Sequence, residues 1–235
     1  MTQIKIENIL KWSEKHTYIL ILGIGIFFLS GQIWPLISLA LLSFIFYIRQ
    51  HLNYLKSLRP FGGYANWVTV FRLLLVCIGG YCYKIWPDPY LFAVFTLAVL
   101  LDVLDGYLAR RFGQSSDFGL YLDMESDAFF VALIATVLYA KGLLEAWLLL
   151  PAYLRYLYML FLKILPGEPK KEPKRSYASI IAGCFFVALL LPFILPYELY
   201  IWPLRICGGL IIISFGISFW FQLFSPVSQT EVVDI

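Results

Sequence analysis

Long apolar segments separated by short polar connections restrict the fold of this chain more than any other feature of its sequence. Each segment is close to the length of ~20 residues with which an α-helix crosses a bilayer. Only 14% of the 235 residues are charged, whereas a soluble domain carries about 25%. We therefore predict an all-α polytopic membrane protein with about eight transmembrane helices. The predicted spans are residues 17–32, 34–49, 66–86, 89–111, 118–141, 143–165, 176–196 and 199–224.

Interruptions of the apolar pattern divide the chain into four parts. Residues 1–16 mix apolar and charged positions, as a short interfacial helix does. Pro60 and the pair Gly62-Gly63 interrupt a polar, basic segment, which suits an interfacial connection. The predicted parts are an interfacial helix with a transmembrane hairpin (1–50), an interfacial linker (51–65), a six-helix core (66–224) and a cytoplasmic tail (225–235).

Most of the 18 lysines and arginines fall on one side of the membrane in this topology. They include the basic loop at residues 166–175, whereas only Arg72 and Arg155 lie at membrane depth. Because cytoplasmic loops carry an excess of Lys and Arg, both termini and this loop are predicted to lie in the cytoplasm. We expect an integral protein of a bacterial cytoplasmic (inner) membrane, with the lipid bilayer as a partner and no nucleic acid.

Residues 102–127 hold five aspartates and a glutamate between flanks that are almost wholly apolar. Carboxylates at membrane depth are costly and usually functional. Their spacing follows the helical repeat, in which positions three, four, seven and eight apart share a face. Asp102, Asp105, Gly106 and Ala109 share one helix face, and Gly119, Asp123 and Asp127 share a face of the next helix.

Two antiparallel helices joined by a short loop would bring both pairs of aspartates together near the cytoplasmic surface. Four carboxylates in one place repel one another unless cations lie between them. Hard divalent cations with oxygen ligands resolve this conflict, and a pair of such ions is the usual device for phosphoryl transfer. We therefore predict two Mg²⁺ or Mn²⁺ ions bound by Asp102, Asp105, Asp123 and Asp127.

The same residues resemble the signature of the CDP-alcohol phosphotransferases, also called CDP-alcohol phosphatidyltransferases. That signature reads Asp-x2-Asp-Gly-x2-Ala-Arg-x8-Gly-x3-Asp-x3-Asp. The six predicted spans from residue 66 onward are similar to the six-helix core of this family, in which the first two spans have no counterpart. The chain matches the signature at Asp102, Asp105, Gly106, Ala109, Arg110, Gly119, Asp123 and Asp127.

The resemblance implies a role for each of these positions. Asp127 would act as the general base and as a further metal ligand, because it need only accept a proton from a hydroxyl next to a metal. Gly106 and Ala109 would line the pocket for cytidine, and Arg110 would contact the phosphates of the substrate. The metals themselves would be held by Asp102, Asp105 and Asp123.

A second group of residues resembles the motif that opens the first core helix of the family. Its residues Asn66, Thr69 and Arg72 would bind the nucleotide phosphates or brace the aspartates. Arg155, in the fourth core span, has two interpretations from the residues alone, structural pairing and acceptor binding. The resemblance favours acceptor binding for Arg155.

Two further acids of the same region are left out of the predicted site. Ser115, Ser116 and Asp117 are plausible starting residues of the helix that follows, and Asp117 is expected to be a cap and not a ligand. Glu125 lies two positions from Asp123 and two from Asp127, which puts it off their shared face.

The resemblance implies an enzyme of phospholipid synthesis. A phosphatidyl or similar group would pass from CDP-diacylglycerol, or a related CDP-lipid, to a small polar alcohol, and CMP would be released. The glycerol-phosphate and cardiolipin enzymes of the family usually have Lys directly after the last aspartate, where this chain has Ala128. That difference argues against those two acceptors, while serine, inositol, inositol phosphate and choline remain open.

Two alternatives remain at this point. Within the family, a CDP-linked head group such as CDP-choline or CDP-ethanolamine could be donated to diacylglycerol. From a different class, a cation or proton transporter would also use buried acids, but it would explain neither the small residues Gly106 and Ala109 on the aspartate face nor Arg110 after them. Family members are often homodimers, which makes a second copy of this chain a further expected partner.

Overall fold

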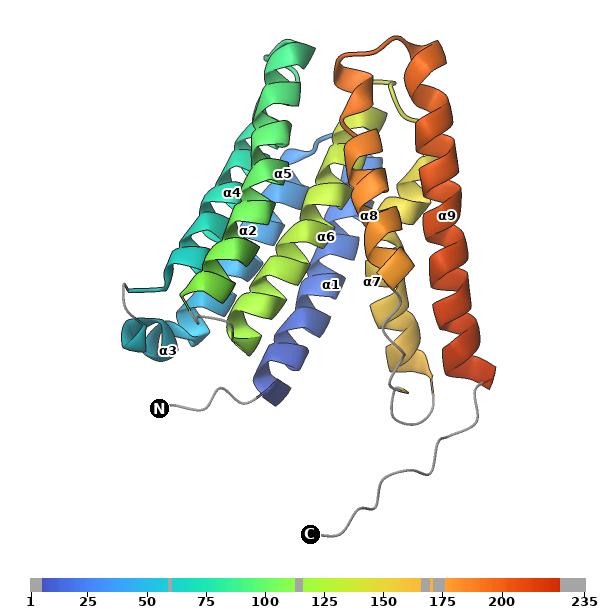
Figure 1. The fold of residues 1–235 in the computed structure, drawn as a ribbon. Coiled ribbons are helices and arrows are strands. Elements are labelled where there is room, and N and C mark those ends of the chain that lie inside the picture. The colour runs from blue at the N-terminus through green and yellow to red at the C-terminus, as the bar shows by residue number, and fades with distance from the viewer. Residues whose placement is uncertain (1–5, 59–60, 113–115, 166–169, 171–175, 225–235) are drawn as a thin grey trace.

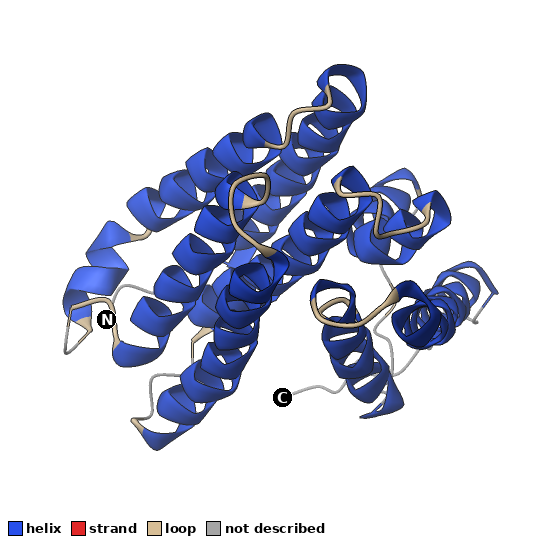
Figure 2. Cartoon of the chain, turned by 90° about the horizontal axis from the view of Figure 1, so that it is seen from above, coloured by secondary structure: helices blue, strands red, loops and turns tan. Residues whose placement is uncertain are grey.

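The computed structural model describes residues 6–58, 61–112, 116–165, 170 and 176–224 (Figure 1), with the backbone alone at residues 6–7, 109–110 and 176. Over these residues the predicted all-α class is confirmed, because the elements are helices and no strand is present (Figure 2). The elements are α1 (Ile6–Ser30), α2 (Trp34–Gln50), α3 (Leu52–Ser57), α4 (Tyr64–Cys82), α5 (Asp88–Arg111), α6 (Asp117–Ala140), η1 (Ala146–Leu148), α7 (Leu149–Ile164), α8 (Ser176–Ala188), η2 (Leu191–Phe193) and α9 (Tyr197–Phe224).

The long helices form a bundle in which α6 is central (Figure 1). This helix packs against α4 and α7, and also against α1 and α2. Its second half, from Phe129 to Leu138, is buried at nearly every position. A helix that is apolar on all sides is either buried inside a protein or spans a membrane. In α6 the buried positions show the first case, and this central place gives one helix contact with several others.

Several helices are long and apolar enough to cross a membrane. Among the described residues, four meet this description by length and composition, namely Tyr64–Cys82, Asp88–Leu108, Ala146–Ile164 and Tyr197–Phe224. Large apolar side chains such as Trp202, Ile213 and Trp220 are exposed on the outer surface of α9. Exposed apolar surface of this extent is expected where a helix faces lipid. These features are those of an integral membrane protein.

The connections follow the predicted breaks. Gly142, predicted to end the central helix, adopts a φ of +72° directly after α6. The amide of Gly142 bonds to the carbonyl of Tyr139, and the amide of Leu143 bonds to that of Leu138. This is the Schellman arrangement, and its left-handed position favours glycine. The break between α6 and α7 is therefore encoded locally.

The start of α1 differs from the prediction. A separate interfacial helix was expected up to residue 16, but a single helix runs from Ile6 to Ser30. Ser13, His16 and Thr17, which lie at the expected boundary, are almost fully buried. The Thr17 hydroxyl donates to the Ser13 carbonyl at 3.1 Å. Because these polar side chains find partners inside the protein, α1 enters the bundle instead of turning along the membrane surface.

Candidate active site

The four aspartates come from two neighbouring helix ends, as predicted. Asp102 and Asp105 lie in the last part of α5, while Asp123 and Asp127 lie in the first part of α6. One carboxylate oxygen from each of Asp102, Asp123 and Asp127 lies within 4.8 Å of the others. Three carboxylates at such spacing form a group that is able to bind a metal ion.

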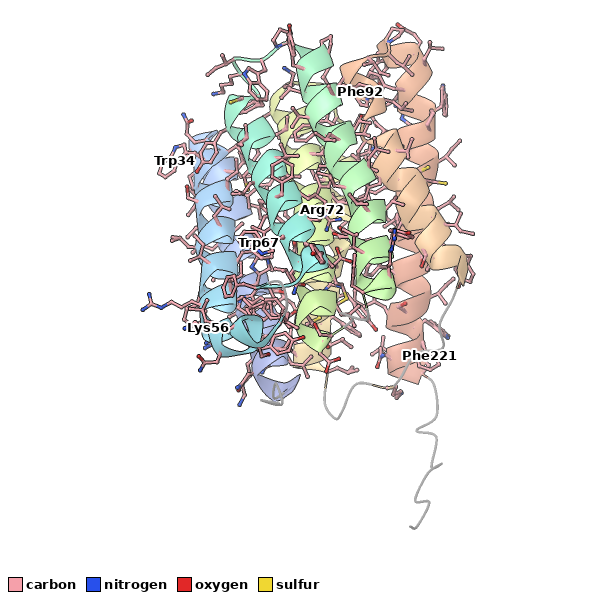
Figure 3. All side chains as sticks on the ribbon, turned by 60° about the vertical axis from the view of Figure 1, so that its left-hand side comes forward. Trp34, Lys56, Trp67, Arg72, Phe92 and Phe221 are labelled. Carbon is pink, nitrogen blue, oxygen red and sulfur yellow. The ribbon has the colours of Figure 1, made fainter. Side chains whose placement is uncertain are left out.

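Arg72 of α4 lies between these carboxylates. Its side chain is 1% exposed, and Figure 3 shows it within the bundle while Trp34 and Lys56 lie at the outer edge. Arg72 donates hydrogen bonds to Asp102 and to Asp123, the latter at 2.8 Å from Nη2. Of the two predicted roles for Arg72, this geometry is that of a brace for the aspartates.

A second donor contact fixes the orientation of the Arg72 guanidinium. Its Nη2 atom donates to the Ser126 hydroxyl at 2.9 Å, and Nη2 also lies 2.8 Å from Asp127 Oδ1. Asp127 Oδ1 is buried and, apart from this ion pair, has no hydrogen-bond partner among the described residues. A buried carboxylate oxygen requires a positively charged partner, a role that Arg72 has in this structure and that a bound metal ion would share.

The balance of charge at the site also fits a divalent cation. Four carboxylates and one guanidinium leave three formal negative charges. Salt bridges to Arg72 therefore cannot neutralise the cluster by themselves. Oxygen ligands of this kind are preferred by Mg²⁺ and Mn²⁺. The residues present at this place thus fit such an ion.

Asp105 is placed differently from the other three aspartates. It is only 4% exposed, and its Oδ2 atom accepts a hydrogen bond from the Thr69 hydroxyl at 2.9 Å. The nearest guanidinium nitrogen of Arg72 is 3.9 Å away. Thr69 therefore braces an aspartate, as the second motif suggested. The proposed role of Asp105 as a metal ligand stays a prediction.

Gly119 allows α4 and α6 to approach each other closely. A Cβ atom at this position would lie 2.9 Å from Asn66 Oδ1, closer than real Cβ atoms come to other atoms. The Asn66 amide donates to the Gly62 carbonyl at 2.8 Å, which fixes its side chain. The N-cap of α6 is Ser116, whose hydroxyl accepts from the Gly119 amide. Of the expected starting residues, Ser116 is therefore the cap, and Asp117 is the first helical residue.

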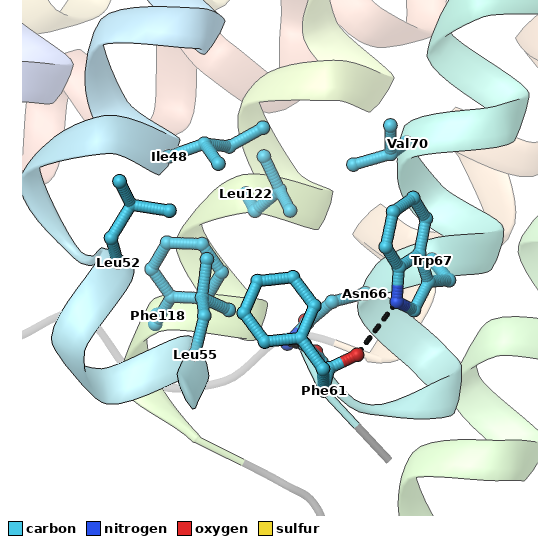
Figure 4. A pocket seen from close by; sticks show the side chains of 10 residues that line it. Ile48, Leu52, Leu55, Phe61, Asn66, Trp67, Val70, Phe118 and Leu122 are labelled. Atoms are coloured by element: carbon cyan, nitrogen blue, oxygen red, sulfur yellow. Dashed lines mark hydrogen bonds between the residues drawn. The ribbon is translucent and has the colours of Figure 1, made fainter. Parts of the chain in front are cut away.

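An apolar cavity of about 240 Å³ lies beside Asn66, between α2, α3, α4 and α6 (Figure 4). Phe118 and Leu122 of α6 form part of its wall. Trp67 also lines it, and the Trp67 indole donates to the Phe61 carbonyl at 2.7 Å. Asn66 is the one amide in a lining that is otherwise apolar. Through Asn66 the second motif contacts both Gly119 and this cavity.

The predicted nucleotide residues lie at the end of α5. Gly106 is half-buried and directly follows Asp105. The side chains of Ala109 and Arg110 lie outside the described residues, so their contacts stay predictions. All three positions follow the aspartates along the same helix toward its carboxyl end.

Arg155 of α7 pairs with Glu125, the acid that the sequence analysis left out of the site. Its Nη2 atom donates to Glu125 Oε1 at 2.7 Å, and the Glu125 side chain is 1% exposed. The structural pairing considered for Arg155 is therefore present, and acceptor binding stays a prediction. A signal for Glu125 existed in the sequence, since a carboxylate at membrane depth needs a partner and Arg155 was, beside Arg72, the other basic residue expected at that depth.

Comparison with known proteins gives a match to the core region. A family model described as CDP-alcohol phosphatidyltransferase matches residues 63–223. Curated relatives include a CDP-diacylglycerol--glycerol-3-phosphate 3-phosphatidyltransferase of Pseudomonas fluorescens, 41% identical over 90 residues, which are 37% of this chain and 46% of that protein. The enzyme of the same name from Yersinia enterocolitica is 37% identical over 90 residues, or 49% of its length. The chain thus spans about half the length of the curated relatives it matches. No solved structure matches it.

Proposed function

The chain belongs to the CDP-alcohol phosphatidyltransferase family, and on this premise we propose that it transfers a phosphatidyl group from CDP-diacylglycerol, or a similar CDP-lipid, to a small polar alcohol. CMP is the second product. The observation that carries this proposal is the group formed by Asp102, Asp123 and Asp127, whose carboxylate oxygens lie within 4.8 Å of one another. The core proposed to perform the reaction is residues 66–224, and residues 1–50 precede it and pack against it through α1 and α2.

These aspartates, with Asp105 beside them, would hold two Mg²⁺ or Mn²⁺ ions, which neutralise the negative charge of the donor phosphates and of the departing CMP. Arg72 holds the carboxylates of Asp102 and Asp123 in place through its hydrogen bonds to both. Thr69 does the same for Asp105. The protein thus presents acceptor oxygens that are already oriented, which lowers the cost of reaching the reactive geometry.

Asp127 is proposed as the general base. In the reaction the alcohol oxygen forms a bond to the lipid-side phosphorus, and the bond from that phosphorus to the CMP oxygen breaks. The electron pair leaves with CMP, and the hydroxyl proton passes to Asp127. Asp127 Oδ1 accepts no hydrogen bond from the described residues and forms an ion pair of 2.8 Å with Arg72, which supports a carboxylate at this position that is able to accept a proton. Gly106, Ala109 and Arg110 are proposed contacts of the CDP group, and Arg155 is a proposed contact of the acceptor.

The active site is proposed to face the cytoplasm of a bacterial cell, in the inner membrane. The first turns of α1, the last turns of α5 and α9 and the first turns of α6 lie at the same end of the bundle (Figure 1). The described basic residues near that end support this orientation under the positive-inside rule. They are Arg49 at the end of α2, Lys56 in α3, Arg111 at the end of α5 and Lys163 at the end of α7.

Two observations bear on the identity of the acceptor alcohol, and they disagree. The relatives are named for glycerol 3-phosphate, whereas Ala128 stands where the family's glycerol-phosphate enzymes usually have Lys. Glycerol 3-phosphate is therefore the first acceptor to test, with serine, inositol, inositol phosphate and choline beside it.

Purified protein in detergent, given labelled CDP-diacylglycerol and each alcohol in turn, tests the proposal. We expect CMP release and a new phospholipid with one alcohol, loss of both on adding EDTA, and recovery with Mg²⁺ or Mn²⁺. Transfer from CDP-choline to diacylglycerol would establish the reversed roles instead. Folded protein that releases no CMP with any donor would contradict the proposal and favour a transporter.

A further inference from the structure

Helix α1 lies outside the residues that match the family, yet it contacts the helix that carries Asp127. Its Ser13 hydroxyl donates to Glu125 Oε1 of α6 at 2.5 Å. Ser13 and Glu125 are both fully buried. A neutral donor bound to a carboxylate forms a charge-assisted hydrogen bond, which is stronger than a neutral one. The N-terminal part is therefore bonded to a buried charge of the core.

Glu125 also accepts hydrogen bonds from Arg155. Arg155 Nη2 donates to Oε1, the oxygen that Ser13 binds, at 2.7 Å, and Arg155 Nε lies 3.4 Å from Oε2. Ser13 holds the carboxylate from α1 and Arg155 approaches it from α7, so the three residues form a chain across three helices. We call Ser13, Glu125 and Arg155 the relay.

Arg155 is the open end of the relay. Its side chain is 25% exposed, against 1% for Glu125. Two of the five N–H groups of a guanidinium are directed at Glu125, which leaves the others able to donate to oxygen atoms of a ligand. The planar fork of Arg suits the oxygens of phosphate or carboxylate.

Polar groups around the relay tie α1 firmly in place. His16 Nδ1 and Ser43 Oγ of α2 share a hydrogen bond of 2.8 Å, and the Trp12 indole donates to the Ser43 carbonyl at 3.1 Å. On the side of α7, Glu14 forms an ion pair of 3.0 Å with Lys163. Because α1 is fixed at the turns on both sides of Ser13, the position of its hydroxyl is determined by the fold.

Two buried polar atoms near the relay lack hydrogen-bond partners among the described residues, His16 Nε2 and the Tyr156 hydroxyl. The centroids of these rings are 6.5 Å apart. Unsatisfied buried polar atoms are rare in parts of a protein that serve packing alone. The region between α1 and α7 therefore carries more polar groups than helix association requires.

We propose that Ser13 is a positioning residue for the acceptor. It fixes Glu125, Glu125 fixes the Arg155 guanidinium, and the open N–H groups of Arg155 bind an anionic group on the acceptor alcohol. The inference rests on the proposed function, because it assumes that Arg155 contacts the acceptor. Holding a flexible arginine in its binding geometry before the ligand arrives reduces the entropy cost of binding.

Steady-state kinetics of Ser13→Ala, with glycerol 3-phosphate as the acceptor probe, test this inference. The KM for glycerol 3-phosphate should rise about tenfold, as expected for the loss of a hydrogen bond to a charged group. The kcat and the KM for CDP-diacylglycerol should stay at wild-type values. Ser13→Thr keeps a hydroxyl and should restore the acceptor KM, whereas Ser13→Cys, a weaker donor, should raise it.

Thr17→Val is the matched control. Thr17 lies one turn further along α1, is equally buried, and among the described residues its hydroxyl bonds to the Ser13 carbonyl of its own helix and to no other group. This variant should leave the acceptor KM unchanged. An equal effect of Ser13→Ala and Thr17→Val would overturn the inference, because it would show a general effect of α1 packing.

The remaining outcomes separate this inference from the proposed function. Wild-type turnover with glycerol and no other alcohol would overturn the anionic acceptor site, while the transferase activity would stand. Wild-type turnover with glycerol 3-phosphate and an unchanged KM in both Ser13→Ala and Ser13→Cys would overturn the role of Ser13. Absence of CMP release by the wild-type protein with every acceptor would overturn the proposed function itself.

Discussion

Arg72 and Arg155 contact acidic side chains of the same central helix from opposite directions. Glu125 lies two positions from Asp123 and from Asp127, about half a helical turn around α6. Arg72 reaches the aspartates from α4 and is shared among several carboxylates. Arg155 reaches Glu125 from α7 and pairs with that carboxylate alone among the described residues.

The two arginines differ in the net charge of the group around them and in the hydrogen-bond donors that remain unused. Around Arg72 the carboxylates are in excess, so the group as a whole attracts cations. Around Arg155 the charges of the pair cancel, and the guanidinium is 25% exposed with N–H groups to spare. The same residue type thus leaves excess negative charge beside Asp102, Asp123 and Asp127 and leaves unused hydrogen-bond donors beside Glu125. The first group corresponds to the proposed metal site and the second to the proposed acceptor contact, from which the acceptor hydroxyl has to reach Asp127.

Asp127→Asn should produce the largest change. The amide cannot accept the hydroxyl proton, and general base catalysis contributes about 10²- to 10⁴-fold to a rate. We expect kcat to fall by about that factor, while the thermal unfolding temperature stays near that of the wild type. Measured CMP release is the readout, and a variant with wild-type kcat would show that the base is another group.

Arg72→Gln and Arg155→Gln test the contrast between the two sides directly. Removing one partner of a buried ion pair is strongly destabilising. We expect the free energy of unfolding to fall by about 3 kcal/mol, at the low end of the usual range, because the aspartates are partly exposed. Mn²⁺ should restore much of the stability of Arg72→Gln, since a cation can replace the lost charge among the aspartates. It should not restore Arg155→Gln. Thermal unfolding in detergent with and without MnCl₂ measures both, and equal rescue would refute the contrast.

Arg155→Lys keeps the charge but loses the planar fork. We expect the KM for glycerol 3-phosphate to rise about tenfold, because Lys cannot bind Glu125 and a ligand with the same geometry. The KM for CDP-diacylglycerol should not change. A rise of both KM values together would mean that Arg155 supports the fold of the whole site and has no particular contact with the acceptor.

Glu145→Gln should have the smallest effect and serves as a reference pair. Glu145 lies between α6 and η1, where the hydrogen bond from Arg205 is the main cause that lowers the pKa of its carboxyl to about 2, followed by the bond from Trp147. Because this pKa is lowered from 4.5, the contribution of Glu145 to stability is complete above about pH 4.5 and is lost as the pH falls toward 2.

At neutral pH we expect Glu145→Gln to lower the unfolding temperature by about 2 °C or less, since the pair is exposed to solvent. The difference from the wild type should shrink between pH 4.5 and 2. A difference that stays constant over that range would assign it to packing of the side chain and not to its charge.

Much of the site could be predicted because its spacing is local. Asp102 and Asp105 on one helix, and Asp123 and Asp127 on the next, follow the helical repeat, and a short connection brings two such faces together. The same logic predicted the helical segments and the break at Gly142. What these predictions share is that the residues within a few positions of one another decide the outcome.

The partners of these residues could not be predicted in the same way. Ser13 and Glu125 are 112 positions apart, and no periodicity connects them. Glu125 was left out because its position on the helix was compared with the positions of the aspartates alone. Its contacts with α1 and α7 do not follow from spacing along the sequence. Likewise, the course of α1 through residue 16 depends on Ser43 and Glu125, which offer its polar side chains partners inside the bundle.

The contact between Gly119 and Asn66 acts as a spacer for the metal site. Asn66 precedes Thr69 and Arg72 on α4, and Gly119 precedes Asp123 and Asp127 on α6. A methyl group at Gly119 would lie 2.9 Å from Asn66 Oδ1, so the Asn66 side chain or the two helices would have to move apart. Thr69 and Arg72, which bond to Asp105 and Asp123, follow Asn66 on the same helix. The signature glycine thereby leaves room for the contact between the helix that carries these braces and the helix that carries Asp123 and Asp127.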